Sequence, residues 1–562
     1  MKLSQMFNWE IKAHKNKVNF LFIAVLILTA VFFRFYNLNW DQGHFFHPDE
    51  RNIDNAVSGI VFFSQMNPKF FAYGGFSIYL YKAASLLLYL ITKNSNWAFD
   101  WGNINLIARF FSAFFSTLTI LPLYFLTEKI ANKKIGLLTI FLYVFSVGSI
   151  QTAHYGVTES LITLIVVLIC LFSVLLFKKI TLLKIFTLGL ISGIGIATKT
   201  TSLIFFIIPF TTFIFLIFKK EYKFLRIFNY FFIFLITAFV VFIIFSPYTF
   251  LSLNKFLESM RYESGVATGS LPVVYTLQFD KTIPYLFQMQ NFFWQVGPVA
   301  IFTILGFIFV LLKMIKDKNK LYLILSLFPL VYFLYVGSWH TKFIRYMMPL
   351  LPFLLIFASI FLFWLRSNKR WLGNFFIIFS ILTSLLWTLA FFTIYTKPQT
   401  RIAASTWIYN NVSPGARILN EQWDDGLPLP LDNFNPSNYS ITSLAMYEAD
   451  NTEKINYLST NLANSDYIIF NSRRLYGTLI NLNEKYPITS KYYKLLFSSK
   501  LGYSQVKSFT SYPSLFGVSI NDDSSEETFQ VYDHPKVLIF KNNEKLSYSE
   551  IKLILSELTQ EN

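Results

Sequence analysis

Long apolar runs separated by short basic clusters fill the first 390 or so residues of the chain. Crossing about 30 Å of hydrocarbon at 1.5 Å per residue takes roughly 20 residues in a helix. The runs lie near residues 18–36, 104–127, 135–153, 160–177, 185–198, 201–218, 227–246, 296–312, 321–337, 346–365 and 371–393, and 185–198 is the shortest. The pattern predicts a polytopic α-helical membrane protein with about eleven spans.

One more apolar stretch, residues 72–93, decides the topology. If it crosses, the basic clusters at 129–134, 178–184, 219–226, 313–320 and 366–370 all face the side opposite the N-terminus. If it lies along the outer face or dips into it, all of them face the cytoplasm, as basic loops usually do. The second arrangement also keeps Lys82 out of the bilayer centre and uses Gly74-Gly75 for a bend. We therefore expect eleven crossings plus a re-entrant or juxtamembrane helix.

The N-terminus carries Lys2, Lys12, Lys15 and Lys17 ahead of the first apolar run, and no small-residue cleavage site follows. We expect an uncleaved first span rather than a signal peptide. The N-terminus is then cytoplasmic, and an odd number of crossings places the C-terminal part outside. The expected location is the plasma membrane.

The composition changes past residue 394, where Asn, Ser, Asp and Glu become frequent and the apolar runs become short. Segments 416–420, 466–471 and 537–541 are typical of buried strands, and 401–411, 475–486 and 547–558 of amphipathic helices. We predict a transmembrane domain over residues 1–395 and an external soluble α/β domain over 396–562.

Composition and charge exclude several classes of protein. A soluble chain of 562 residues could not bury 54% hydrophobic residues that include 66 Phe. The net charge of +17 comes from the basic clusters between spans, so it indicates topology and not a nucleic-acid partner. One cysteine, Cys170, allows neither an internal disulfide nor a thiolate metal cluster. No nucleotide-binding loop, HExxH or Ser/His/Asp order is present.

Two adjacent carboxylates, Asp49 and Glu50, follow the first span on the external side. A partly desolvated carboxylate at a membrane surface is a stronger base, suited to take a proton from a hydroxyl. Pro48-Asp49-Glu50 is also typical of a helix start, where acids are favoured, and both interpretations can hold. Glu159, at the external end of a span, could orient an acceptor, bind a divalent cation with Asp49, or balance a cation; alternatively it is an acid at a helix end.

The external face also carries cations, against the topological trend. Arg345, Lys342 and His340 cluster before the span that begins near residue 346, and Lys199 lies between two closely spaced spans. Phosphate binding needs such charges, and the arginine fork suits it best. Headgroup anchoring is the alternative for the cluster, and Arg109 could pair with lipid phosphate or with an acid of the first loop.

Together these features resemble the GT-C glycosyltransferases, in particular the dolichyl-phosphate-mannose protein mannosyltransferase type (family 39) and its prokaryotic, aminoarabinose transferase-like relatives. The resemblance is carried by Asp49-Glu50, the re-entrant stretch, Glu159, Ala197-Thr198-Lys199 and Arg345-Tyr346. It implies a polyprenyl-phosphate sugar donor, mannose-like or similar, and a protein, lipid or glycan acceptor. Asp49 would be the base, supported by Glu50 and Glu159. Arg345, Lys199, Lys342, His340 and Arg109 would serve the donor phosphate.

A single base and a single displacement imply inversion at the anomeric carbon. The aminoarabinose transferases carry a Glu before Lys-Pro-Pro in the re-entrant stretch, whereas this chain reads Phe71-Ala72-Tyr73-Gly74-Gly75. No dedicated metal site is therefore predicted, although a divalent cation stays open. Two alternatives remain, a transporter or flippase of a lipid-linked sugar and a lipid-binding scaffold. Transport needs polar groups near mid-bilayer, and the span interiors are almost free of charges.

Overall fold

The computed structural model describes residues 3–219 and 221–557, so Lys2 and Lys220 of the basic segments lie outside the described residues. The chain divides into two compact units. Unit 1 comprises the chain up to Asn39, His47–Gly265 and Pro284–Leu389, and unit 2 comprises Trp40–Phe46, Val266–Ile283 and the chain from Ala390 onward. The predicted boundary after residue 395 stays a prediction.

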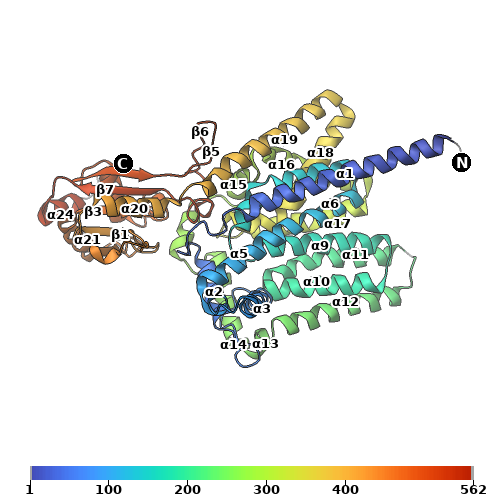
Figure 1. Cartoon of the computed structure of the whole chain (residues 1–562), viewed down its shortest axis with the longest axis horizontal. Helices are drawn as coiled ribbons and strands as arrows, with labels where there is room; N and C mark the ends of the chain where they lie inside the picture. The colour runs from blue at the N-terminus through green and yellow to red at the C-terminus, as the bar shows by residue number, and fades with distance from the viewer. Residues whose placement is uncertain (1–2, 220, 558–562) are drawn as a thin grey trace. The chain divides into compact units, whose positions relative to one another are not determined.

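Each apolar run of the sequence forms helix, all of it in unit 1 except the last residues of the final run (Figure 1). The helices are α1 (Leu3–Phe35), α5 (Trp101–Leu118), α6 (Ile120–Ile130), α7 (Lys133–Val144), α8 (Val147–Ala153), α9 (Glu159–Lys178), α10 (Leu182–Thr198), η1 (Thr200–Phe206), α11 (Ile207–Phe218), α12 (Phe224–Phe245), α15 (Leu286–Val296), α16 (Ala300–Asp317), α17 (Lys320–Gly337), η4 (Ile344–Leu350), α18 (Leu351–Asn368) and α19 (Arg370–Phe392). Within the described residues, 9 helical segments are long and apolar enough to span a membrane, and the pair α7 and α8, bent by 54°, makes up to 10. The predicted polytopic helical membrane protein is confirmed.

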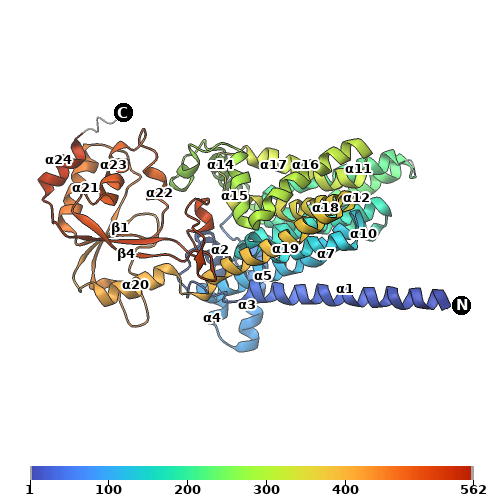
Figure 2. The ribbon, with the colours of Figure 1, turned by 90° about the horizontal axis from the view of Figure 1, so that it is seen from above.

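Helix α3 (Gly75–Thr92), the stretch that decides the topology, passes the same test of length and hydropathy. Its direction differs from that of the spans. Figure 1 shows α3 end-on while the long helices lie in the plane of the view, and in Figure 2 it runs across them. A crosswise helix suits the membrane surface better than a crossing. Lys82 is buried in α3, and its ammonium donates to the Ala98 carbonyl oxygen at 2.9 Å.

The basic loops gather at one end of unit 1. The Lys178 ammonium donates to the Lys129 carbonyl oxygen at 2.7 Å, Lys219 lies over the Phe177 ring, and Lys320 lies over the Phe215 ring. Figure 1 shows the α11–α12 and α18–α19 turns toward the end at which α1 begins. Because α9 runs from Glu159 to Lys178, Glu159 marks the opposite end.

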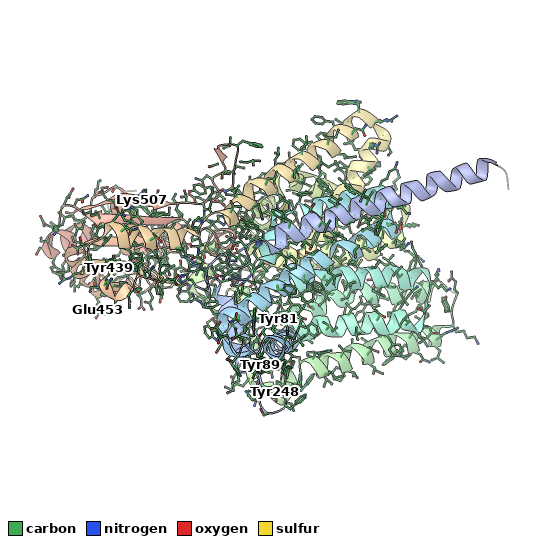
Figure 3. The ribbon with its side chains drawn as sticks, in the orientation of Figure 1. Tyr81, Tyr89, Tyr248, Tyr439, Glu453 and Lys507 are labelled. Carbon is green, nitrogen blue, oxygen red and sulfur yellow. The ribbon has the colours of Figure 1, made fainter. Side chains whose placement is uncertain are left out.

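Unit 2 contains a five-stranded mixed sheet with the order β2-β1-β3-β7-β4. The strands are β1 (Arg417–Glu421), β2 (Ser440–Leu444), β3 (Tyr467–Phe470), β4 (Tyr503–Phe509) and β7 (Val537–Asn542). β1 pairs in parallel with β2 and β3, and β7 pairs antiparallel with β3 and β4. β4 is an edge strand whose middle is exposed, and Lys507 on it, labelled in Figure 3, is the kind of residue that protects an edge from further pairing.

Alternating side chains divide the sheet residues between two layers of helix. Leu419, Ile468 and Phe540 face a core shared with α21 (Thr452–Asn464), α23 (Pro487–Phe497) and α24 (Tyr548–Ser556). α20 (Thr400–Asn411) contacts β4 and β7, and its Trp407 ring meets Phe509 of β4. The C-terminal α/β domain expected from composition is thus present.

The three predicted strands and the helices at 401–411 and 547–558 are confirmed, apart from residue 558, which lies outside the described residues. The predicted helix at 475–486 is wrong: α22 (Tyr476–Leu479) is one turn, and a new helix begins at Pro487. Asn residues compete with helix formation, and a proline disfavours helical backbone at the preceding residue. Strands β2 and β4 were not predicted, because half-exposed strands lack an apolar run.

Candidate functional site

The acidic pair begins helix α2 (Pro48–Ser58), in unit 1. His47 is the N-cap, and its Nδ1 accepts from the Asp49 backbone N–H at 3.3 Å. Pro48 occupies the first helical position, where its fixed φ is suited and no N–H is needed. The predicted helix start is confirmed. Because successive helix residues point about 100° apart, the two neighbouring acids face different surroundings.

Glu50 faces inward and is fully buried with Arg109 of α5. The guanidinium Nε and Nη2 donate to the two carboxylate oxygens at 2.8 and 2.7 Å. The Gly156 backbone N–H also donates to Glu50, and Arg109 Nη1 donates to the Leu38 carbonyl oxygen at 2.8 Å. Both side chains are 0% exposed. This bidentate pair joins α2 to α5 and to the segment that precedes α9.

Asp49 faces the other way and forms an ion pair with Arg345 of η4, while both side chains keep about a fifth of their surface exposed. The Tyr73 hydroxyl donates to the same Asp49 oxygen at 2.9 Å. Burial raises the pKa of the Asp49 carboxyl, but the charges of Arg345, His47 and Lys199 and the Tyr73 hydrogen bond together hold it well below its usual range. In this state Asp49 is a charged but weak base.

A second ion pair lies beside the first. Lys199, between α10 and η1, donates to Glu159 Oε1 at 3.2 Å. The ammonium also lies 5.0 Å from the Tyr73 ring centroid and 5.9 Å from that of Tyr346. The other Glu159 oxygen, Oε2, is buried and has no hydrogen-bond partner among the described residues. Tyr73 therefore contacts both pairs, through its hydroxyl to Asp49 and through its ring to Lys199.

Tyr73 was not predicted as a site residue, and its position depends on the glycine that follows. The Gly74 N–H donates to the Thr198 carbonyl oxygen at 2.8 Å, and a Cβ on Gly74 would lie 2.0 Å from the Ala197 carbonyl oxygen. Only glycine permits this approach of the segment to the end of α10. Burial, followed by the nearby charges of Asp49 and Glu159, raises the pKa of Tyr73, so its hydroxyl stays a donor.

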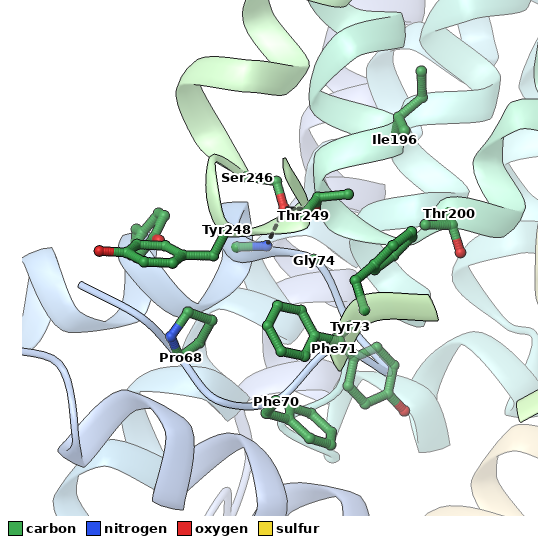
Figure 4. Close-up of a pocket in the computed structure, with 13 residues that line it drawn as sticks. Pro68, Phe70, Phe71, Tyr73, Gly74, Ile196, Thr200, Ser246, Tyr248 and Thr249 are labelled. Atoms are coloured by element: carbon green, nitrogen blue, oxygen red, sulfur yellow. Dashed lines mark hydrogen bonds between the residues drawn. The ribbon is translucent and has the colours of Figure 1, made fainter. Parts of the chain in front are cut away.

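A pocket opens on the other side of the same segment (Figure 4). It is partly open to solvent, and its enclosed space is about that of one water molecule. Of its 13 lining residues, 6 are aromatic and 6 carry a hydroxyl group. The lining residues are Pro68, Phe70, Phe71, Tyr73, Gly74, Gly75, Tyr79, Ile196, Thr200, Ser246, Tyr248, Thr249 and Phe256. A small pocket of mixed polarity thus adjoins the charged cluster, with Tyr73 in both.

Glu263 of α14 (Leu253–Thr268) faces the same charges. Burial raises the pKa of its carboxyl, Lys199 and Arg345 act in the opposite direction, and Asp49 adds to the increase. The Thr200 hydroxyl contacts Met260 Sδ at 3.4 Å, which places α14 beside the start of η1. Glu263 was not among the site residues predicted from the sequence.

The other predicted residues have different surroundings. Lys342 is buried, and its ammonium donates to the His340 carbonyl oxygen at 2.7 Å. Arg109 is paired with Glu50 as described. The predictions that Lys342, His340 and Arg109 serve a donor phosphate stay predictions. Across residues 3–219 and 221–557, no group of three or more His, Cys, Asp or Glu side chains is arranged to hold a metal ion.

Comparisons with known proteins give a family match and a fold match. Residues 99–250 match the family model described as dolichyl-phosphate-mannose-protein mannosyltransferase. No curated protein matches the chain.

Among solved structures, the archaeal oligosaccharyltransferase AglB from Archaeoglobus fulgidus, in complex with an inhibitory peptide and a dolichol-phosphate, has a TM-score of 0.53 at 13% identity over 90% of this chain and 75% of that one. The apo form of the Archaeoglobus fulgidus oligosaccharyltransferase has a TM-score of 0.52 at 13% identity, over 93% and 88%. At this identity the likeness shows a shared fold.

Proposed function

We propose, from the premise that this chain belongs to the GT-C glycosyltransferases, that it transfers a sugar from a polyprenyl-phosphate donor to an acceptor hydroxyl at the membrane surface. The premise rests on the family segment at residues 99–250 and on the shared fold. The observation that carries the proposal is the pair of ion pairs Asp49–Arg345 and Glu159–Lys199, which Tyr73 connects. One cluster thus offers a base, a second acid and two cations.

The reaction assigns a role to each charge. The acceptor oxygen attacks the anomeric carbon as its proton passes to Asp49. The bond between the anomeric carbon and the phosphate oxygen breaks, and the lipid phosphate leaves as an anion. Arg345 and Lys199 stabilise that anion, so no strong general acid is needed. One displacement from the face opposite the phosphate inverts the anomeric configuration.

The ion pair implies that the donor activates the base. With Arg345 bound, Asp49 has a lowered pKa and takes up a proton poorly. A phosphate that draws Arg345 away removes the largest charge that lowers this pKa, and burial then favours protonation. Asp49 thus becomes a competent base only when a donor phosphate is in place.

The remaining acids and cations act around this centre. Glu159, with one buried oxygen unused, is suited to accept a hydrogen bond from the sugar or the acceptor hydroxyl, and it releases Lys199 to the phosphate. The buried Glu50–Arg109 pair holds α2 in place, so that Glu50 supports Asp49 by position. Both side chains of this pair are fully buried, which suits a structural link between α2 and α5.

The aromatic side chains beside Tyr73 support a lipid donor. Phe70, Phe71 and Phe256 line the pocket together with Tyr73, and such rings suit contact with an isoprenoid chain. Because Tyr73 also contacts Asp49 and Lys199, a tail that packs against these rings would place its phosphate near the cations.

The basic end of unit 1 supports a proposed orientation of the chain in the membrane. If that end faces the cytoplasm, as basic loops do, the site opens on the external side of the plasma membrane. The description of the matched family model supports mannose or a similar hexose as the proposed sugar. The proposed acceptor hydroxyl belongs to a protein, a lipid or a growing glycan.

The test uses purified full-length protein in lipid nanodiscs. A panel of dolichyl- and undecaprenyl-phosphate hexoses is incubated with the chain and membrane extract, and transfer is followed by mass spectrometry. Transfer from at least one donor, lost in Asp49→Asn and kept in Glu128→Gln, supports the proposal. Glu128 pairs with Lys129 and Lys133, among the basic loops. No transfer from any donor, with lipid movement between leaflets intact, would favour a flippase instead.

A further inference from the structure

A small apolar hairpin projects from unit 2 (Figure 1). Strands β5 (Ser514–Leu515) and β6 (Val518–Ser519) pair antiparallel around a two-residue turn, in which Phe516 has φ 50° and Gly517 has φ 81°. Positive φ at both turn positions is typical of a tight hairpin turn. The tip is apolar and open: Phe516 is 89% exposed and Val518 is 66% exposed. Ile520 continues the apolar surface.

The base of the hairpin is held to the segment that follows the last membrane helix. The Ser514 N–H donates to the Thr393 hydroxyl at 3.4 Å, and the Lys397 ammonium donates to the Ser514 hydroxyl at 3.0 Å. Thr393 begins η5 (Thr393–Thr396), directly after α19. The last residues of α19, from Ala390 on, belong to unit 2 as the hairpin does.

The position of α19 sets the height of the hairpin. Its 23 residues measure about 35 Å at 1.5 Å per residue, a little more than the hydrocarbon thickness of about 30 Å. A helix of this length that spans the hydrocarbon would end at or just beyond its boundary, which would put Thr393 and Lys397 at the level of the lipid headgroups. The hairpin that they hold would start at the same level.

We propose that hairpin β5–β6 lies against the membrane surface and inserts the side chains of Phe516 and Val518 among the lipids, while Lys397 contacts lipid phosphate. Aromatic side chains are favoured at this interface, and nearby lysines anchor to headgroups. A lipid surface also explains why such large apolar side chains are left uncovered on so short a hairpin. Two strands of two residues offer little area for a protein partner, which needs on the order of 800 Å² per side.

The test places a fluorescent probe at the tip. The sole native cysteine, Cys170, is buried, so single cysteines introduced in the full-length chain can be labelled with an environment-sensitive nitrobenzoxadiazole dye. Phe516→Cys and Val518→Cys report the tip, and both positions are exposed enough for folding to proceed. Asn543→Cys, on an exposed loop after β7, is the matched control.

In nanodiscs of phosphatidylcholine and phosphatidylglycerol, the tip probes are expected to shift their emission to the blue. Lipids spin-labelled near the headgroup should quench them at least twofold, and the control should stay unquenched. Emission and quenching equal to those of the control would overturn the proposal. So would a blue shift without lipid quenching, since it would mean that protein covers the hairpin. Neither readout depends on catalytic activity.

Discussion

Replacing Asp49 with Asn separates a catalytic base from a residue that only holds Arg345. The amide has the shape of the carboxylate and can still accept the Tyr73 hydrogen bond, so the site geometry is retained, but it cannot take a proton. General-base catalysis contributes about 10²- to 10⁴-fold, so kcat should fall by that factor, which is about 2.7–5.4 kcal/mol of activation free energy.

Donor binding should change in the opposite direction. In the native protein a phosphate must displace Asp49 from Arg345, and a hydrogen bond to a charged group is worth about 1.5–3 kcal/mol. Asp49→Asn removes that competition, so affinity for farnesyl phosphate, a polyprenyl phosphate without a sugar, should rise by up to roughly ten- to a hundredfold. Arg345→Gln should weaken the same binding.

The assay combines steady-state transfer in nanodiscs with titration of farnesyl phosphate, for the native chain, Asp49→Asn, Arg345→Gln and the Glu128→Gln control. The pH dependence adds a check: without Arg345 the pKa of Asp49 rises, so the acid limb of kcat/KM should move to higher pH. A kcat of Asp49→Asn within tenfold of native, together with weaker farnesyl phosphate binding, would show that Asp49 only positions Arg345.

Three further predictions concern the frame around the site and the stability of each unit. Gly74→Ala should lower the free energy of unfolding by about 1–3 kcal/mol through overpacking, because the added Cβ meets the Ala197 carbonyl group. The same variant should reduce sugar transfer more than tenfold. Gly59→Ala is the control: its Cβ meets nothing closer than 3.5 Å, so it should change neither thermal unfolding nor the transfer rate. Glu50→Gln should lower the free energy of unfolding by about 3–5 kcal/mol, because it removes the carboxylate charge that faces the buried Arg109 guanidinium. Glu258→Gln, in an exposed pair with Lys255, should lower it by under about 1 kcal/mol, and equal losses in thermal unfolding would contradict this assignment. In unit 2, burial opposes the charge of His534, but Asp533 and Asp522 on its ring nitrogens outweigh it and raise the pKa to about 10. The pKa of His534 is therefore higher in the folded protein than the unfolded value of 6.5, so the charged imidazolium stabilises the fold. This stabilisation is complete below about pH 6.5 and is lost as the pH rises to about 10, at about 1.4 kcal/mol per pKa unit. Amide hydrogen exchange in β7, corrected for its intrinsic pH dependence, should accelerate over that pH range in the native chain and much less in His534→Gln. An identical pH dependence in the native chain and the variant would refute the role of His534.

The apolar runs were sufficient to predict the membrane class and the helices, because a segment of about 20 apolar residues has few alternatives to a membrane helix. The basic clusters indicated that 72–93 is not a crossing, and α3 does lie across the bundle helices. The start of α2 was also predicted, since a cap and a proline are local signals. Strands β2 and β4 were missed because their exposed faces carry no such signal.

The partners of the charged residues were beyond the sequence. Asp49 and Glu50 are neighbours with the same chemistry, and nothing local says which is free to meet a substrate. Helix geometry turns one toward Arg109, 59 positions later, and the other toward Arg345, 296 positions later. Tyr73 carried no signal at all, because tyrosine is common in membrane-surface segments and its role comes from the approach of Gly74 to α10.

The sequence by itself determined the class of the protein, the helical segments, the end at which its charges gather and the family it resembles, because these depend on the solvent that each segment prefers. Only the tertiary structure decided which acid meets which cation, that Tyr73 joins the two ion pairs, and that the hairpin at Phe516 is held beside the end of α19. Such pairings depend on the packing of residues far apart in the chain, which no local pattern encodes.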